Sequence, residues 1–143
     1  GKMILEGKHL AILNFGARLN ECKKASEILK KKGITISIFD ARFAKPLDEK
    51  LIIELASNHD GIISIEEGSI GGFGSHVSKL LSERGFFDKG LKFRSMFLPD
   101  KFLDQDTPEK MYKSAGLNSE SIVQKIESTL NSNIVIAKNK NLS

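Results

Sequence analysis

Short apolar runs along the chain alternate with longer stretches in which apolar residues recur every three or four positions. The short runs are rich in β-branched and aromatic residues, and they predict strands at residues 9–15, 34–39, 61–66 and 92–98, with a short edge strand at 3–5. Strands that alternate with helices are typical of helices packed on a mostly parallel sheet. We therefore expect an α/β fold.

Helical spacing occupies the intervals between these strands. Leu19, Cys22, Ser26 and Leu29 predict the first helix, and Gly33 follows where a left-handed residue is favoured at a helix end. Lysines occupy the other faces of this helix and predict a solvated surface. Further helices are predicted at residues 48–58, around 77–81, from the Thr107-Pro108 pair, and from Ser119 through Leu130.

The chain reads as one domain followed by a tail. Its 143 residues are enough to bury roughly two-thirds of the surface that the unfolded chain exposes. No internal repeat and no Pro/Gly/Ser-rich linker divides the sequence. We expect one domain over residues 1–130 and a polar, lysine-rich, flexible tail over 131–143.

Composition and charge exclude several classes of protein. The net charge of +4 is concentrated in the first helix and the tail, and the basic run of that helix contains no aromatic residue, which argues against a nucleic-acid partner. No apolar run reaches the length of a membrane span, and the start lacks a signal-peptide pattern. The single Cys22 fits a reducing compartment. We expect a cytoplasmic protein without a membrane partner.

A glycine-rich segment at residues 66–75, EEGSIGGFGS, follows a predicted strand and precedes a predicted helix. Such turns often bind phosphate, but neither phosphate motif is complete here. When Gly72 and Gly74 are taken as the closely spaced pair of a dinucleotide fingerprint, Val77 occupies the place of the third Gly or Ala. Glu66 and Glu67 would also repel a phosphate. A conformational or interface role is favoured over anion binding.

The chemically active side chains of the sequence have weak signals for catalysis. Glu66 and Glu67 could serve as acid and base, but neighbouring strand residues point to opposite faces of a sheet. His76 opens a helix, where capping or packing is the more frequent role. Cys22 lies on an apolar helix face with no base near it in sequence. We assign no catalytic, cofactor-binding or metal-binding residue.

Loops that follow parallel strands gather at one edge of a sheet, where sites and interfaces form. The loops at residues 40–48 and 98–106 place Phe43 and Phe102 among charged residues, which suggests burial against something else. We expect these two loops and the glycine-rich segment to share one edge. The interface candidates are Arg42, Phe43, Glu66, Glu67, Gly71, Gly72, Phe73 and Phe102.

Five blocks of sequence carry a resemblance to a known family: NFGARL at 14–19, DARFAKPLD at 40–48, EEGSIGGFGSHV at 66–77, LPDKFLDQ at 98–105 and EKMYKSAGL at 109–117. In order and spacing the chain closely resembles the C-terminal domain of 1-deoxy-D-xylulose-5-phosphate synthase. The resemblance implies a three-layer α/β/α structure of the transketolase C-terminal type. Its five-stranded mixed sheet would have a short antiparallel first strand.

The resemblance also implies an activity for the parent enzyme. Members of that family are homodimeric transferases that use thiamine diphosphate and Mg²⁺ to join pyruvate to glyceraldehyde 3-phosphate with loss of CO₂, for isoprenoid, thiamine and pyridoxal synthesis. The groups that hold the cofactor belong to the family's other domains, and the Gly-Asp-Gly motif is absent from this sequence. We expect this fragment to bind no cofactor, to be inactive alone, and to pack on the remaining domains and support the dimer. The alternative is an independent module that binds an anionic ligand or a protein.

Overall fold

The computed structural model describes residues 2–16, 18–41, 48–67, 72–98 and 118–141. Their side chains are described except for those of Glu67, Leu98 and residues 132–141. In chain order the elements are β1 (Lys2–Leu5), β2 (Leu10–Asn14), α1 (Leu19–Lys30), β3 (Ile36–Asp40), α2 (Glu49–Asn58), β4 (Gly61–Glu67), α3 (Phe73–Glu83), β5 (Lys92–Leu98) and α5 (Ser119–Asn141).

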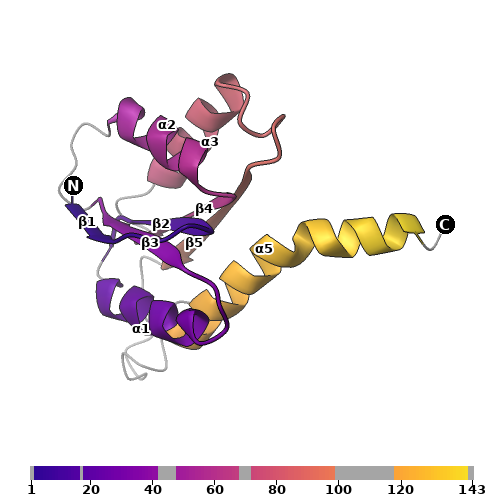
Figure 1. Ribbon diagram of the computed structural model, residues 1–143. Coiled ribbons are helices and arrows are strands. Elements are labelled where there is room, and N and C mark those ends of the chain that lie inside the picture. The colour runs from indigo at the N-terminus through magenta and orange to yellow at the C-terminus, as the bar shows by residue number, and fades with distance from the viewer. Residues whose placement is uncertain (1, 17, 42–47, 68–71, 99–117, 142–143) are drawn as a thin grey trace.

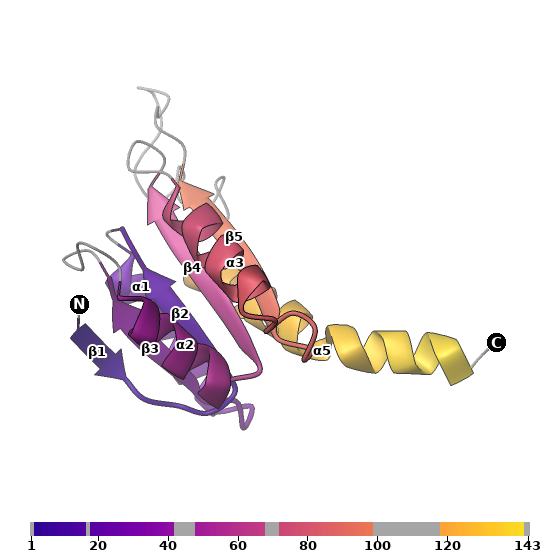
Figure 2. The ribbon, with the colours of Figure 1, turned by 90° about the horizontal axis from the view of Figure 1, so that it is seen from above.

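The strands form one five-stranded sheet in the order β1-β3-β2-β4-β5. β2 to β5 are parallel, whereas β1 pairs antiparallel with β3, so that Lys2 lies opposite Asp40 at the carboxyl end of β3. The chain therefore enters the sheet at the edge where the parallel strands end (Figure 2). The mixed sheet and its short antiparallel first strand are as expected from the sequence.

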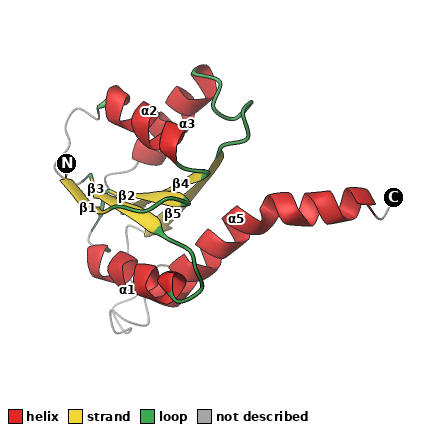
Figure 3. Ribbon diagram, viewed as in Figure 1, coloured by secondary structure: helices red, strands yellow, loops and turns green. Residues whose placement is uncertain are grey.

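Helices cover both faces of the sheet, which gives three layers (Figures 1 and 3). α1 and α5 pack on one face with a core that includes Ile12, Leu29 and Ile122, while α2 and α3 pack on the other with a core that includes Leu13, Ile52 and Leu81. All five residues of β2 are buried because this central strand has a strand on each side and helices on both faces. The three-layer α/β/α prediction is confirmed.

Local sequence signals explain where several elements begin and end. Gly33 has a φ of +79° shortly after α1, a conformation that glycine adopts without steric cost. Asp48 caps α2, because its side chain accepts a hydrogen bond from the backbone N–H of Lys50 at 3.0 Å. The predicted strand 92–98 coincides with β5. The predicted short helix at Thr107-Pro108 lies outside the described residues.

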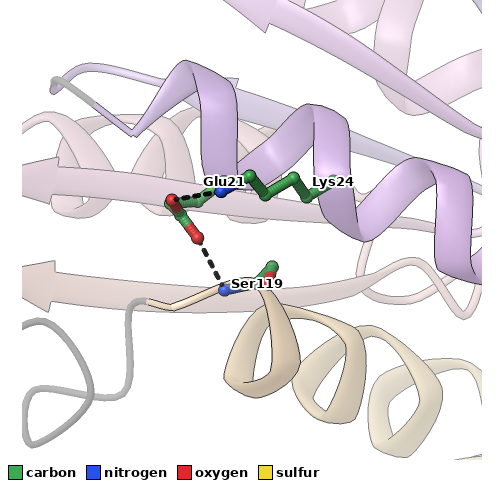
Figure 4. A network of polar contacts seen from close by, with 3 residues as sticks. All are labelled: Glu21, Lys24 and Ser119. Atoms are coloured by element: carbon green, nitrogen blue, oxygen red, sulfur yellow. Dashed lines mark hydrogen bonds and ion pairs between the residues drawn. The ribbon is translucent and has the colours of Figure 1, made fainter. Parts of the chain in front are cut away.

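The start of α5 is held against α1 by polar contacts (Figure 4). The Glu21 carboxylate accepts a hydrogen bond from the backbone N–H of Ser119 at 3.1 Å and lies 3.6 Å from the ammonium of Lys24. Asn118 caps the helix by accepting from the N–H of Ser121 at 2.9 Å. From there α5 runs to Asn141, beyond the sheet and into the segment interpreted as a tail (Figure 1). The flexibility of residues 131–143 stays a prediction.

Within the described residues, no helix combines the length and the apolar composition that crossing a bilayer requires.

Candidate functional site at the carboxyl edge of the sheet

The carboxyl edge of the sheet contains a topological switch point between β2 and β4. These strands are neighbours, but the chain leaves β2 toward α1 on one face and leaves β4 toward α3 on the other (Figure 1). In open α/β sheets, diverging connections of this kind leave a crevice beyond the strand ends where sites form. The residues at this point are Asn14 at the end of β2, Phe15 directly after it, and Glu66 near the end of β4.

Glu66 contributes a buried carboxyl group to this edge. Its side chain is 1% exposed, and its Oε2 accepts a hydrogen bond from the backbone N–H of Gly74 at 3.0 Å. Gly74 belongs to the first turn of α3, where amide groups lack partners within the helix and the helix dipole favours negative charge. The other carboxylate oxygen, Oε1, is buried and has no hydrogen-bond partner among the described residues. One half of the carboxylate is thus satisfied and the other is not.

Two glycines allow α3 to begin this close to the sheet. Gly72 directly precedes the helix at a φ of +106°, in the left-handed region. A Cβ on Gly74 would lie 2.8 Å from both the Ser64 Oγ and the Ser95 Oγ, which are themselves linked by a 3.2 Å hydrogen bond. Conformation and packing therefore account for Gly72 and Gly74 without a ligand.

Two phenylalanines join the segment after β2 to the start of α3. The rings of Phe15 and Phe73 stack with centroids 4.6 Å apart and planes inclined by 6°. Asn14, fully buried, holds the turn below them, because its amide Nδ2 donates to the carbonyl oxygen of Gly16 at 2.9 Å. The stacked pair forms an apolar contact at the carboxyl edge, between the end of β2 and the start of α3.

Phe97 adds an exposed apolar group to the same edge. It is 51% exposed and lies opposite Glu66 in the pairing of β4 with β5. Residues opposite each other on paired strands point to the same face, so Phe97 lies on the side of the sheet that α3 covers. Sequence reasoning missed Phe97 because it placed the residue inside a strand. Its position near the end of an edge strand is the signal that could have identified it.

The structure brings only some of the predicted interface residues together. Glu66, Gly72 and Phe73 all lie at the carboxyl edge. The backbone of Glu67 completes β4, although its side chain is not described. The remaining candidates, Arg42, Phe43, Gly71 and Phe102, lie outside the described residues. That the three loops share one edge therefore stays a prediction.

The other candidate side chains show no activated group. Cys22 is fully buried, and burial raises the pKa of its thiol to about 12 against the opposing effect of the nearby Arg18 guanidinium. A thiol held neutral in the core is not a nucleophile. His76 is exposed on α3. Cys22 is therefore not a nucleophile, whereas the capping or packing role expected of His76 stays a prediction.

The described residues of this edge do not fit thiamine diphosphate and its metal ion. A Mg²⁺ that carries a diphosphate is held through oxygen ligands such as carboxylates. Among the described residues, no three His, Cys, Asp or Glu side chains gather as a metal site would need. The side-chain oxygens at the crevice are already engaged within the chain, since Glu66 Oε2 accepts from the N–H of Gly74 and Asn14 Oδ1 accepts from the N–H of Gly16. We derive no step through the cofactor on this chain.

The fold is similar to part of two solved transketolase structures. The chain superposes on part of a split-gene transketolase solved as an inactive β4 tetramer, with a TM-score of 0.76, 27% identity, and coverage of 91% of this chain and 42% of that one. A transketolase mutant from Pichia stipitis, solved with xylulose 5-phosphate, matches with a TM-score of 0.56 and 15% identity over 90% of this chain and 18% of that one. The chain thus spans less than half the length of these transketolases.

The family model for the transketolase C-terminal domain matches residues 1–122, which include every strand and the first turn of α5. The match agrees with the five-stranded mixed sheet and the helices on both of its faces. The chain belongs to the transketolase C-terminal domain family.

Proposed function

We propose that this chain is the C-terminal domain of a 1-deoxy-D-xylulose-5-phosphate synthase. Membership of the transketolase C-terminal domain family supports the general class, and the five ordered sequence blocks support the particular enzyme. The whole enzyme joins pyruvate to glyceraldehyde 3-phosphate with loss of CO₂. Thiamine diphosphate, bound with Mg²⁺ by the other domains, supplies the electron sink for that chemistry.

Within this enzyme the chain is a docking domain whose side chains do not touch the reacting atoms. The observation that carries this role is the carboxyl edge, where a buried carboxylate oxygen without a partner lies beside the exposed Phe97. Phe97 is half-exposed, and an exposed aromatic group at a sheet edge is typical of a surface that another domain covers. The docked domain positions its neighbours and supports the homodimer.

Assembly and location complete the proposal. The split-gene transketolase that resembles this chain was solved as a tetramer, which supports an oligomeric enzyme here. The free, buried Cys22 is compatible with the reducing cytoplasm, where we place the enzyme. An antibody against this domain should detect a native species several-fold larger than its 15.8 kDa. A native species near that mass would contradict covalent attachment to the other domains.

A product assay tests the activity. The full-length enzyme is expected to release CO₂ from pyruvate only when glyceraldehyde 3-phosphate is present, and to form a five-carbon product. The control is a sugar-phosphate assay, in which an ordinary transketolase moves a two-carbon ketol unit from xylulose 5-phosphate to an aldose phosphate without CO₂. Ketol transfer in place of decarboxylation would overturn the assignment to the synthase and leave the family membership intact.

A further inference from the structure

We propose that the outer edge of β5 is a docking site for an extended, acidic peptide segment of another protein, which adds one more strand to the five-stranded sheet. This edge runs along the side of the sheet, parallel to the strands, and not across the strand ends (Figure 2). The inference goes beyond the proposed function, because the partner is not a domain of the same enzyme.

The backbone of β5 presents hydrogen-bonding groups along its outer edge. β5 is the last strand in the order of the sheet and pairs with β4. The N–H of Lys92 donates toward β4, to Asp60 O at 3.1 Å, so the backbone groups of every second residue counted from Lys92 face β4. The backbone groups of Phe93, Ser95 and Phe97 therefore face away from the sheet.

One of these outward groups already has a partner. The Arg94 guanidinium donates to the carbonyl oxygen of Phe93 at 2.8 Å, in agreement with the outward direction of that carbonyl. Among the described residues, no group pairs with the outward N–H and C=O of Ser95. Because a strand exchanges hydrogen bonds with its neighbour through alternate residues, Ser95 is the central position for a docked strand.

The opposite side of the sheet is less suited to strand addition. β1, the edge strand there, has four residues and a register shift between Met3 and Leu5. Short and irregular edge strands are a common means by which folded proteins prevent further strand pairing. β5 has seven residues, in unbroken register with β4 from Lys92 to Leu98. Of the two edge strands, β5 therefore keeps the regular template.

A groove accompanies β5 on each face of the sheet. The groove between β5 and α3 has a volume of about 470 Å³, and its lining includes Ser78, Lys79 and Ser82. The groove between β5 and α5 has a volume of about 600 Å³, and its lining includes Gln124 and Lys125. Successive side chains of a strand point to opposite faces, so neighbouring residues of a docked strand enter the two grooves in turn.

The charge of the grooves identifies the occupant as acidic. Lys79 lines one groove and Lys125 lines the other, and no acidic side chain of the described residues lines either. Arg94 adds an exposed positive group on β5 itself. The hydroxyl and amide groups in the two linings can also donate hydrogen bonds to a carboxylate. A strand with two adjacent acidic residues meets one lysine on each face, whereas a basic strand is repelled.

A second copy of this chain is a poorer occupant. Two β5 edges that paired antiparallel about a two-fold axis would bring each surface patch against its own counterpart. Lys79, Arg94 and Lys125 would then each approach a like charge. Like charges in direct opposition across strands or interfaces are unfavourable.

Binding of a defined peptide to the full-length enzyme tests the site. The probe is the end-capped, fluorescein-labelled hexapeptide Val-Thr-Glu-Glu-Val-Thr, whose adjacent glutamates point to opposite faces of a strand. Fluorescence anisotropy measures its affinity, and hydrogen–deuterium exchange locates it. The Ser95 amide is expected to exchange at least tenfold more slowly with the peptide bound, since its outward N–H becomes hydrogen-bonded. No binding at millimolar peptide would overturn the proposal.

A proline at position 95 tests the backbone contact. Ser95→Pro removes an N–H that takes no part in the pairing with β4, a position where an edge strand tolerates proline. It should weaken peptide binding at least tenfold. The matched control Ser95→Ala keeps the N–H and should bind as tightly as the wild type. Equal affinities of Ser95→Pro and wild-type enzyme would overturn the proposal.

If Ser95→Pro fails to fold by circular dichroism, exchange in the wild-type enzyme decides. A Ser95 amide whose exchange rate is unchanged by the bound peptide would overturn the proposal, and a slowed rate would support it. Sedimentation provides a further check on the occupant. A self-association of the enzyme that Ser95→Pro abolishes and the peptide does not displace would assign the edge to a second copy and overturn the proposal.

Charge reversal tests the chemistry of the occupant. The double variant Lys79→Glu with Lys125→Glu should weaken binding of the acidic peptide at least tenfold and strengthen binding of Val-Thr-Lys-Lys-Val-Thr. The matched control is Lys23→Glu with Lys30→Glu, two exposed lysines that line a groove beside β1, and it should leave both affinities unchanged. Equal loss of binding in the two double variants would show attraction by net charge alone and would overturn the proposal.

Discussion

The amino and carboxyl edges of the sheet differ in how their polar groups are hydrogen-bonded. At the amino edge, backbone hydrogen bonds join the segments that lead into the strands: His9 N–H donates to Thr35 O at 3.0 Å, Asp60 N–H to His9 O at 2.9 Å, and Lys92 N–H to Asp60 O at 3.1 Å. At the carboxyl edge, Glu66 keeps a buried oxygen without a partner among the described residues. Among the described residues, backbone hydrogen bonds therefore join the segments at the amino edge, whereas the carboxyl edge holds a buried carboxylate oxygen that none of them reaches.

Side chains strengthen the same contrast. At the amino edge, Ser37 Oγ accepts from the Gly7 N–H at 2.9 Å and lies 2.7 Å from Nε2 of His59, while Nδ1–H of His59 donates to Leu55 O at 2.7 Å. The Nζ of Lys92 is also buried and lacks a partner within the described chain, but the rest of this long side chain is only partly buried, so a rotation can bring Nζ to water. Glu66 has no such freedom. The difference shows that a fixed, buried acceptor stays unsatisfied where a long and flexible side chain can turn to water.

The largest change in the free energy of unfolding is expected from a substitution that disrupts packing at the amino edge. A Cβ on Gly7 would lie 2.5 Å from backbone atoms of Ile36, and a backbone cannot give way as a side chain does. Gly7→Ala should lower the free energy of unfolding of the isolated chain by about 3 kcal/mol, measured by urea denaturation.

Gly33→Ala is the matched control for Gly7→Ala. Gly33 has a φ of +79°, and a Cβ added to it would meet no atom within 4 Å, so only backbone strain opposes the change. That strain should cost about 1 kcal/mol. Equal losses for the two variants would show that the Gly7 approach to β3 does not stabilise the amino edge.

An intermediate effect on the free energy of unfolding is expected from a rise in pH. It tests whether water is excluded from the core around Cys22. Burial, opposed by Arg18, raises the pKa of the Cys22 thiol from an ordinary 9.0 to about 12. The unfolded chain therefore releases this proton near pH 9 while the folded chain keeps it, so stability is lost as the pH rises from 9 toward 12. Between about pH 8 and pH 10 the loss should be about 1.4 kcal/mol.

Urea denaturation at the two pH values measures this loss, and Cys22→Ala isolates it from the titration of lysines. The alanine variant starts from its own lower stability, so the quantity compared is the change between the two pH values. The same change in both proteins would mean that the thiol titrates normally and is open to solvent.

The smallest effect on the isolated chain is expected at the carboxyl edge. Phe97 is half-exposed, so Phe97→Ser should change the stability of the isolated chain by less than about 0.5 kcal/mol. In the full enzyme the same variant should speed hydrogen–deuterium exchange at the Gly74 amide severalfold, because the covering domain loses an apolar contact at this edge.

Phe93→Ser is the matched comparison for Phe97→Ser, because both residues belong to β5. Phe93 points to the same face of β5 but is partly buried against Phe87, with ring centroids 6.4 Å apart. Its loss should destabilise the isolated chain by about 2 kcal/mol or more. A Phe97→Ser variant as unstable as Phe93→Ser would assign Phe97 to the core of this domain.

Local patterns predicted most of the fold because the residues that decide it are near one another in sequence. The apolar run of β2, the cap at Asp48 and the turn at Gly33 were each visible within a few positions. The approach of Gly74 to Ser64 and Ser95 was not, since strands far apart in sequence create it. The exposure of Phe97 depends on how far α3 covers the edge strand. The length of α5 was also missed, although Leu130, Ile134 and Ala137 continue the helical spacing past the predicted end.

Because β1 is antiparallel, a domain that precedes it would be attached at the carboxyl edge of the sheet. A preceding domain that joins at Lys2 is tethered about 14 Å from the surface that it would cover, and a short tether gives an effective concentration in the millimolar range. At that concentration even a contact with a millimolar dissociation constant is half-occupied. Cutting the chain before β1 would remove this advantage, so a version of the enzyme encoded as two polypeptides would need a docking surface of correspondingly higher intrinsic affinity.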